Sequence, residues 1–177
     1  AAIIYPVVIG FTWTAETGLV ASLTGTLLGT EIAFQDFAGG MIVHGMGGLA
    51  GLTAAWILGP RLGRFDGDSV TVIPGHSITF AVLGTLMLAF GWYGFNVGTQ
   101  FQILVAEGDG IAFMGDALGR VAMTTTLSMA AGAMGAAFVA WLKTGKVDTL
   151  YVANGMLAGL VGITAIPNTT AWGGAFL

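Results

Sequence analysis

Long apolar stretches separated by short polar segments dominate this sequence of 177 residues. Four of these stretches contain no Asp, Glu, Lys or Arg. A helix needs about 20 apolar residues to cross the hydrocarbon core of a bilayer, which is about 30 Å thick. The pattern therefore predicts an all-α fold, a polytopic transmembrane helical bundle. Its spanning helices are expected at 37–59, 76–101, 118–142 and 149–165.

A fifth apolar piece opens the chain at 1–13. As a helix it would be about 20 Å long, because each residue adds about 1.5 Å, and it is therefore too short to cross. A signal peptide begins with positive charge, and this piece carries none. We interpret 1–13 as the truncated end of a membrane helix. The last segment, 172–177, has neither a charge nor a helix stop, so we expect the chain to be the middle of a longer protein.

Composition excludes several classes of protein. Charged residues make up 8% of the chain, against about a quarter in an ordinary soluble domain. The chain has no Cys, which rules out a disulfide framework and any Cys-ligated metal. Five Lys and Arg against nine Asp and Glu, with a net charge of −4, argue against a nucleic-acid partner. A membrane protein in contact with the lipid bilayer remains.

The charges of the connecting segments predict the orientation. Basic residues gather in 60–75 and 143–148, which the positive-inside rule places in the cytoplasm. Acidic residues dominate 14–36 and 102–117, which then lie outside. An acidic outer face favours a cationic substrate, although acidic outer loops are also common without such a role.

Glycine recurs inside the predicted helices at spacings of three and four residues, which places it on one helix face. The pattern is clearest in 37–59, 121–142 and 149–165. Small residues let membrane helices approach closely. We therefore expect a densely packed bundle with many close crossings.

His44 is the most informative residue of the apolar spans. Gly40 and Gly48 lie four residues before and after it, so it should project from the closely packed face, away from lipid. An ionisable side chain at that depth is costly and usually functional, although it could also bridge two helices. His76 lies near the other membrane surface, so we expect no metal ion shared by the two imidazoles.

An aromatic and polar stripe lies near the outer end of 76–101. Trp92, Phe95, Asn96 and Thr99 follow one helical face. Aromatic rings attract a cation and a hydroxyl accepts its N–H, so the stripe suits an outer vestibule. An aromatic belt would explain Trp92 and Trp13 without such a role. Asp36, just before an apolar run, could be a simple N-cap.

Three blocks of sequence resemble the ammonium transporter (Amt/Rh) family. The first runs Asp36-Phe-Ala-Gly-Gly-Met-Ile-Val-His44 and continues to Gly51; the others are Gly91-Trp-Tyr-Gly-Phe-Asn96 and Ala158-Gly-Leu-Val-Gly-Ile-Thr-Ala165. The resemblance implies an eleven-helix fold that assembles as a homotrimer, with one pore per subunit. It also implies two halves related as inverted repeats. The chain would be a partial transporter domain that starts in the fourth helix and ends before the ninth.

The resemblance implies roles at the outer site. Trp13 would help to recruit ammonium by cation–π contact, although the segment before Asp36 is longer than in compact bacterial members. Thr99 stands where the family usually has Ser, and keeps the hydroxyl. Asp36 would organise the outer site and assist ammonium binding or deprotonation, without touching the substrate.

Inside the pore, the resemblance implies that Phe95 is one of two stacked gate rings and that Trp92 lines the wall nearby. His44 would be the first of two paired histidines. The second histidine and the second gate ring belong to helices outside this chain.

The expected function is transport of ammonium as ammonia across the cell membrane, by a multi-pass protein that is not an enzyme and needs no cofactor. A PII-type regulator could bind from the cytoplasm, as often happens in bacterial members. Two alternatives stay open: an ammonium sensor module of a signalling protein, and a Rhesus-type gas channel, against which Trp13 argues. An intramembrane enzyme or a purely structural scaffold fits less well, because nothing resembles a catalytic pair and because a scaffold leaves Asp36 and His44 unexplained.

Overall fold

Helices account for most of the described part of the chain. The computed structural model describes residues 2–13, 24–27 and 30–177. The helices are α1 (Ile4–Thr12), the π-helix η1 (Gly40–Gly45), α2 (Met46–Leu58), α3 (Ile78–Thr99), α4 (Gly115–Thr144), α5 (Thr149–Ile163) and α6 (Trp172–Phe176). The prediction of a mostly helical fold is confirmed. The expected outer segment 14–36 is described only in part, because 14–23 and 28–29 lie outside the described residues.

Three helical segments of the described chain are long and apolar enough to cross a membrane: Gly40–Leu58, Ile78–Thr99 and Gly115–Thr144. The first joins η1 to α2 without a break. The third begins before the expected residue 118 and ends after the expected 142. Helix α5 is apolar but shorter than the length that spans a bilayer.

Three two-stranded antiparallel hairpins occupy the connections, and the sequence analysis did not predict them. They pair β1 (Thr24–Leu27) with β2 (Thr30–Ala33), β3 (Phe65–Asp66) with β4 (Ser69–Val70), and β5 (Leu104–Glu107) with β6 (Gly110–Phe113). In the last two hairpins a Gly-Asp pair forms the loop. Gly67 and Gly108 come first in their loops, with φ of +56° and +58°. Glycine adopts this left-handed conformation without strain, which makes the tight turns possible.

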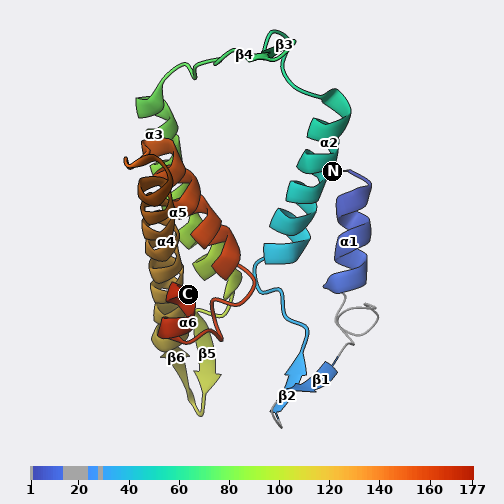
Figure 1. The fold of residues 1–177 in the computed structure, drawn as a ribbon. Helices are drawn as coiled ribbons and strands as arrows, with labels where there is room; N and C mark the ends of the chain where they lie inside the picture. The colour runs from blue at the N-terminus through green and yellow to red at the C-terminus, as the bar shows by residue number, and fades with distance from the viewer. Residues whose placement is uncertain (1, 14–23, 28–29) are drawn as a thin grey trace.

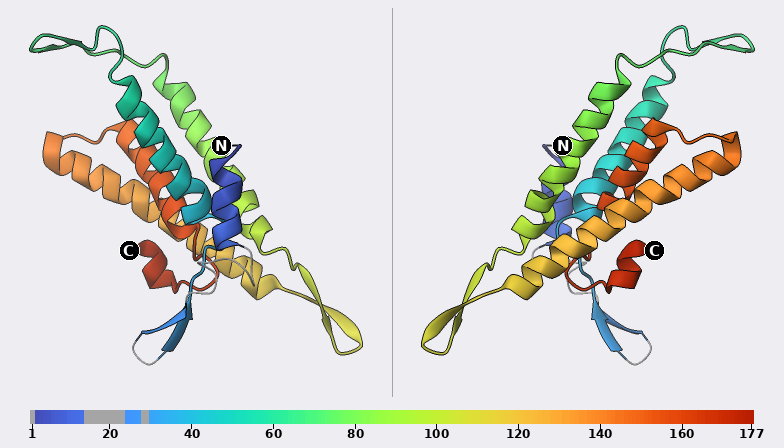
Figure 2. Two further views of the ribbon diagram at one scale, coloured as in Figure 1. Left: turned by 90° about the vertical axis from the view of Figure 1, so that its right-hand side faces the viewer. Right: turned by 90° about the vertical axis from the view of Figure 1, so that its left-hand side faces the viewer.

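The connections divide between the two ends of the molecule. The hairpins β1–β2 and β5–β6 lie at one end, and β3–β4 lies at the opposite end (Figure 1). The side views show the same division, with α4 running obliquely across the other helices (Figure 2). This arrangement fits the predicted alternation of acidic and basic connections across a membrane.

Helices α4 and α5 form a close crossing because glycines face each other there. A Cβ on Gly132 would overlap the carbonyl oxygen of Gly155, and a Cβ on Gly159 would overlap the carbonyl oxygen of Ser128. The Ser128 hydroxyl donates a hydrogen bond to the Gly159 carbonyl at 2.8 Å. The expected close packing is therefore found in this helix pair, where small residues let the two backbones meet.

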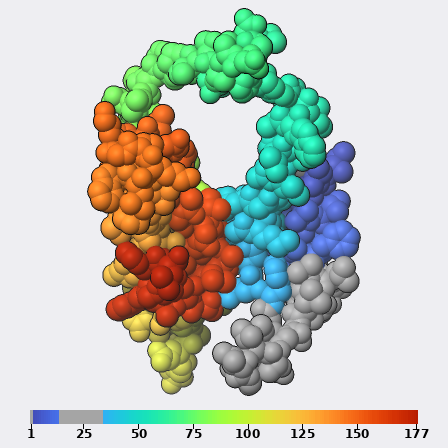
Figure 3. Space-filling view, viewed as in Figure 1, coloured from blue at the N-terminus to red at the C-terminus, as the bar shows by residue number. Residues whose placement is uncertain are grey.

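The same expectation is wrong for α2 within the described chain. A Cβ on Gly47, Gly48 or Gly51 would meet nothing within 4 Å. None of the residues of α2 is buried. Figure 3 shows the reason: α2 is separated from the body formed by α3, α4 and α5 by an open gap beneath the β3–β4 connection.

The two sides of the molecule meet at the entrance to η1. Two backbone N–H groups there, those of Phe37 and Ala38, donate to the carbonyls of Ala165 and Thr164, at 2.8 and 3.1 Å. A Cβ on Gly40 would lie 2.8 Å from the Cβ of Ala165. The segment before His44 is thus fixed against the C-terminal end of α5.

Candidate functional site

Asp36 holds the first turn of η1. Its carboxylate accepts hydrogen bonds from the backbone N–H of Met41, at 3.1 and 3.2 Å to its two oxygens, and from that of Ile42 at 2.8 Å. The side chain is buried, with 5% of its surface exposed. Helix N-termini leave N–H groups unpaired, and a carboxylate is a strong acceptor for them. Gly39, not Asp36, is the N-cap residue of η1, but the Asp36 carboxylate accepts two N–H groups of the turn that carries His44.

Trp13 contacts the same segment from the end of α1. Its indole Nε1–H donates to the backbone carbonyl of Asp36 at 2.8 Å. The ring stays 41% exposed. A Cβ on Gly39 would lie 3.4 Å from the ring. The structure therefore joins two of the predicted site residues, Trp13 and Asp36, at one place.

His44, Trp92 and Phe95 form a cluster of three rings between η1 and α3. The imidazole stacks on the indole of Trp92, with ring centroids 5.0 Å apart and planes at 26°. Its centroid lies 5.4 Å from that of Phe95, and the two aromatic rings of α3 lie 5.7 Å apart. The Nε2 atom of His44 is shielded from solvent and has no hydrogen-bond partner among the described residues. Its hydrogen-bonding capacity is therefore unused within the described residues.

A groove of about 580 Å³ runs along this cluster. Besides the three rings, its lining residues come from α3 and are small or apolar; they are Gly84, Met87, Leu88 and Gly91. The imidazole is the one ionisable group in this lining. An apolar wall with one imidazole suits a small, neutral ligand.

Thr164 is a site residue that the sequence analysis did not single out. Its hydroxyl accepts a hydrogen bond from Nε1 of Trp92 at 2.9 Å and donates to the Leu160 carbonyl at 2.6 Å. It is completely buried. Trp92 and Thr164 are 72 positions apart in the sequence. The sequence carried no signal for this pair beyond the presence of both residues in blocks that resemble the same family.

Asn96 does not face the vestibule, contrary to the expectation that it shares the stripe of Trp92 and Phe95. It is completely buried, and its Nδ2 donates to the Thr125 hydroxyl on α4 at 3.1 Å. Thr99 donates its hydroxyl hydrogen bond to the Phe95 carbonyl of its own helix at 2.7 Å. A joint outer site of Trp13 and Thr99 stays a prediction.

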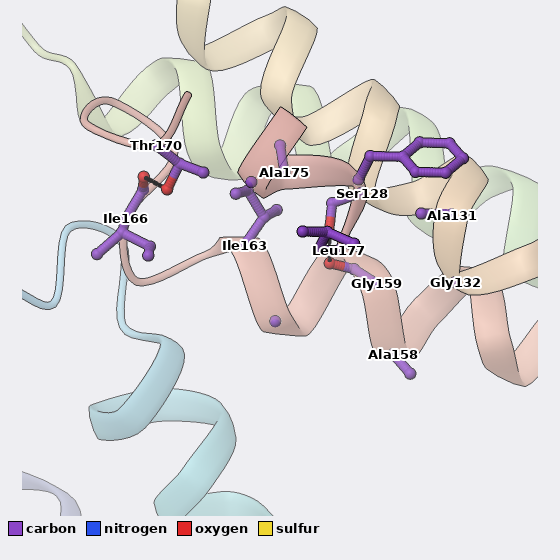
Figure 4. A pocket seen from close by; sticks show the side chains of 13 residues that line it. Ser128, Ala131, Gly132, Ala158, Gly159, Ile163, Ile166, Thr170, Ala175 and Leu177 are labelled. Atoms are coloured by element: carbon purple, nitrogen blue, oxygen red, sulfur yellow. Dashed lines mark hydrogen bonds between the residues drawn. The ribbon is translucent and has the colours of Figure 1, made fainter. Parts of the chain in front are cut away.

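A second cavity, of about 360 Å³, lies between α4, α5 and α6 (Figure 4). Its two lining hydroxyls are already paired. Ser128 donates to the Gly159 carbonyl, and Thr170 donates to the Ile166 carbonyl at 2.7 Å. The described lining thus offers no free side-chain hydrogen-bond donor. Within the described residues, no group of three or more His, Cys, Asp or Glu could hold a metal ion.

Three long apolar helices define this chain as part of a helical membrane protein. The model of the Ammonium Transporter Family matches residues 1–177. The chain belongs to this family, and the resemblance of its three sequence blocks is confirmed. Together with its three apolar helices, membership makes it part of a multi-pass membrane protein.

Relatives are found in archaea and plants. The ammonium transporter Amt2 of Haloferax mediterranei is 63% identical over the whole chain, which covers 37% of that protein. The ammonium transporter 1 member 2 of Oryza sativa is 44% identical over 92% of the chain and 33% of its own length. The names of these relatives are those of transporters and not of enzymes.

Solved structures show the same fold. A protein described as "Sensor Amt Protein" superposes with a TM-score of 0.81 at 30% identity, over 99% of this chain and 40% of its own. Mep2 of Candida albicans superposes with a TM-score of 0.77 at 29% identity, over 99% of this chain and 34% of its own. The chain thus spans between 33% and 40% of the length of these proteins.

Proposed function

We propose that this chain forms part of a pore that carries ammonium across the cell membrane as ammonia. The observation that carries the proposal is the His44 imidazole, stacked on Trp92 beside an apolar groove, with an Nε2 that has no described partner. Membership of the Ammonium Transporter Family supports the choice of substrate.

The physical problem for such a pore is to select ammonium over potassium, a cation of similar size. Moving a bare ion into an apolar passage costs tens of kcal/mol by Born estimates, and the side chains that line the groove beside His44 offer a potassium ion no oxygen ligand. Ammonium can leave its proton behind and cross as a neutral molecule. A neutral imidazole can accept an N–H bond from it or relay its proton.

At the outer end, Trp13 and Thr99 recruit the cation in this proposal. Cation–π attraction is worth about 0.5–2 kcal/mol, depending on how far the ring is shielded from water. The exposed face of Trp13 leaves its ring accessible, while its Nε1–H is used to bond Asp36. Phe95 then acts as the gate ring next to His44, and Trp92 forms the wall.

Asp36 acts at a distance from the substrate. Its carboxylate holds the N–H groups of Met41 and Ile42, and Trp13 holds its backbone. One residue thereby connects the recruitment ring to the turn that carries His44. This supports the expectation that Asp36 organises the outer site without contact with ammonium.

The test uses the full-length protein with His44→Ala. We expect methylammonium uptake to fall by about tenfold or more, because a positioned proton acceptor contributes at least that much. His76→Ala is the matched control, because His76 is exposed and lies before α3, away from the ring cluster. Unchanged uptake with His44→Ala would refute the role of the imidazole.

An ammonium sensor module is the second candidate. The described similarity to a protein called "Sensor Amt Protein" favours it, at 30% identity over 99% of this chain. The same ring cluster would then bind ammonium and report its presence to a signalling partner. A kinase or cyclase domain C-terminal to these residues in the full-length protein would support the sensor function. The Rhesus-type gas channel is disfavoured, because a gas gains nothing from the cation–π site at Trp13.

We further propose that three copies assemble as a homotrimer and that the end bearing β3–β4 faces the cytoplasm, where a PII-type regulator could bind. The basic residues of 60–75 and 143–148 support this orientation. Cross-linking of the purified full-length protein, followed by mass measurement, tests the trimer. Labelling of a single cysteine placed in β3–β4, from each side of a sealed vesicle, tests the orientation.

A further inference from the structure

The turn that carries His44 is wound more loosely than an α-helix. The backbone N–H of His44 donates to the carbonyl of Gly39, five residues earlier, at 3.1 Å. The N–H of Val43 donates to the same carbonyl at 2.9 Å. The N–H of Met46 likewise reaches the carbonyl of Met41, five residues back. A turn closed in this way contains one residue more than an α-helical turn, and such turns occur frequently at functional sites.

The additional residue decides which side chain of the turn faces α3. Each residue of an α-helix rotates the chain by about 100°, so a change of one residue in register turns a side chain to another face. Upstream, the turn is anchored by Asp36 and by the hydrogen bonds of Phe37 and Ala38 to the end of α5. Since that anchor is fixed, the winding of the turn determines whether His44 stacks on Trp92.

Gly39 is the residue that permits this winding. Its φ is +96°, a conformation that strains any residue with a Cβ. A Cβ at this position would also lie 2.6 Å from Cγ2 of Val43, which is inside the same turn. A side chain on Gly39 would therefore change both the backbone that starts the turn and the packing within it.

Gly45, at the other end of the turn, has neither constraint. Its φ is −63°, an ordinary helical value. A Cβ there would meet the Gly40 carbonyl and the Met41 side chain at 3.7 Å, which is normal contact. The two glycines of one turn thus form a natural pair of test and control.

We propose that Gly39 is a positioning residue: its left-handed backbone starts the π-turn that directs His44 onto Trp92 and Phe95. It does not touch the substrate in this proposal. The effect on transport rests on the proposed function, whereas the direction of residue 44 does not.

The direction is measured by cross-linking in the full-length protein. The 177 residues contain no Cys, so His44→Cys with Trp92→Cys introduces one defined pair here, any cysteine elsewhere being replaced by serine. We expect a short bifunctional thiol reagent to join the pair in the parent and in the Gly45→Ala background. In the Gly39→Ala background, the yield should fall by about tenfold, because the strained backbone at position 39 then favours another winding of the turn.

Transport is measured with the native His44 and Trp92 in place. Gly39→Ala should lower the maximal rate of methylammonium uptake by about tenfold, while the apparent affinity set by the outer site changes less than twofold. Gly45→Ala should leave both within twofold. A general loss of structure would lower the amount of assembled protein in the membrane, which is measured in parallel.

A rescue variant keeps the test decisive if Gly39→Ala fails to fold. Asn tolerates the left-handed conformation better than Ala, and Val43→Ala removes the contact with Cγ2 at 2.6 Å, so that the contact with Cβ at 3.2 Å is the closest one left. Gly39→Asn with Val43→Ala should therefore recover cross-linking between positions 44 and 92.

Parent-like cross-linking in folded Gly39→Ala would overturn the proposal, as would a folded rescue variant that does not cross-link. If cross-linking falls as expected but the parent does not transport ammonium, the positioning role stands and the proposed function is wrong.

Discussion

Two glycine-rich regions of this chain look alike in sequence and differ in structure. In α4 and α5, glycines lie against the opposing backbone, so that Gly132 and Gly159 leave no space for a methyl group. In α2, the equivalent positions meet nothing within 4 Å in the described chain. Small residues that recur every three or four positions thus show that a helix is able to approach another helix closely. They do not show which helix, or whether the partner belongs to this part of the protein.

The two regions also fix their helices by different means. The α4–α5 crossing depends on backbone contact and on one hydroxyl, that of Ser128. The η1–α2 segment depends on a carboxylate and on rings, because Asp36 binds its first turn and Trp92 stacks on His44. Packing of the first kind tolerates no added atoms. Packing of the second kind depends on polar partners that substitution can remove one at a time.

The largest effect is expected at the α4–α5 crossing. Gly132→Ala should destabilise the full-length protein by about 3 kcal/mol, because the added methyl group overlaps the Gly155 carbonyl and the helices must separate. The free energy of unfolding in detergent measures the loss. Gly135→Ala, on the same helix with nothing within 4 Å, should change it by less than about 0.5 kcal/mol. Equal losses would contradict the distinction between the two kinds of glycine.

Asp36→Ala should have the next largest effect. It leaves the N–H groups of Met41 and Ile42 without their acceptor, and the second of these bonds is buried. An unpaired buried donor costs about 1–3 kcal/mol, so we expect a loss of about 2 kcal/mol. Methylammonium uptake should fall further than stability alone explains, because the turn that carries His44 loses its anchor. Uptake proportional to the amount of folded protein would argue for a purely structural cap.

Thr164→Val tests the hydrogen bond between α5 and the ring cluster. Valine has the shape of threonine, but it removes the acceptor of Trp92 Nε1–H. We expect a loss of about 1–2 kcal/mol in the free energy of unfolding. Ammonium transport should also weaken as the indole is released. Thr53→Val is the control, because Thr53 is exposed on α2 and bonds only its own helix at 2.9 Å among the described residues. If Thr164→Val lowers the free energy of unfolding no more than the control does, the hydrogen bond from Trp92 to Thr164 does not stabilise the fold.

The smallest effect is expected from Asp148→Ala at the start of α5. Asp148 accepts hydrogen bonds from the N–H groups of Leu150 and Tyr151, at 2.8 and 3.1 Å, and both bonds are exposed. Loss of an exposed N-cap costs about 1 kcal/mol. Uptake should stay within twofold of the parent. Comparison with Asp36→Ala then separates a cap that only stabilises a helix from one that places an imidazole. A loss of transport with Asp148→Ala would remove that distinction.

The spanning helices were predictable because lipid imposes a simple rule on them. A segment that crosses the hydrocarbon core must be apolar and must satisfy its backbone internally, which leaves a long helix. The expected 76–101 therefore falls close to α3, Ile78–Thr99. The hairpins were missed because their strands are short and the apolar pattern extends into them. The Gly-Asp pairs at Gly67 and Gly108 were the signal that was present.

The ring cluster was predictable only in its members. His44, Trp92 and Phe95 were each selected from the sequence, but spacing along a helix says nothing about contact between η1 and α3. Asn96 shows the limit of such reasoning. One position separates it from Phe95, yet it turns to Thr125 on α4 while Phe95 meets His44.

By itself, the sequence determined that this chain is helical, lies in a membrane and belongs to the ammonium transporter family. Hydropathy and sequence motifs are local properties, so they can be identified without knowledge of the tertiary contacts. The tertiary structure decided the π-turn at Gly40–Gly45, the role of Gly39 in starting it and the bond from Trp92 to Thr164. The bond from Trp92 to Thr164 joins positions 72 apart, and distant residues at the end of α5 also hold the segment that leads into the π-turn. A local sequence pattern does not predict such contacts, because their stabilising energy is gained only when the two segments pack together.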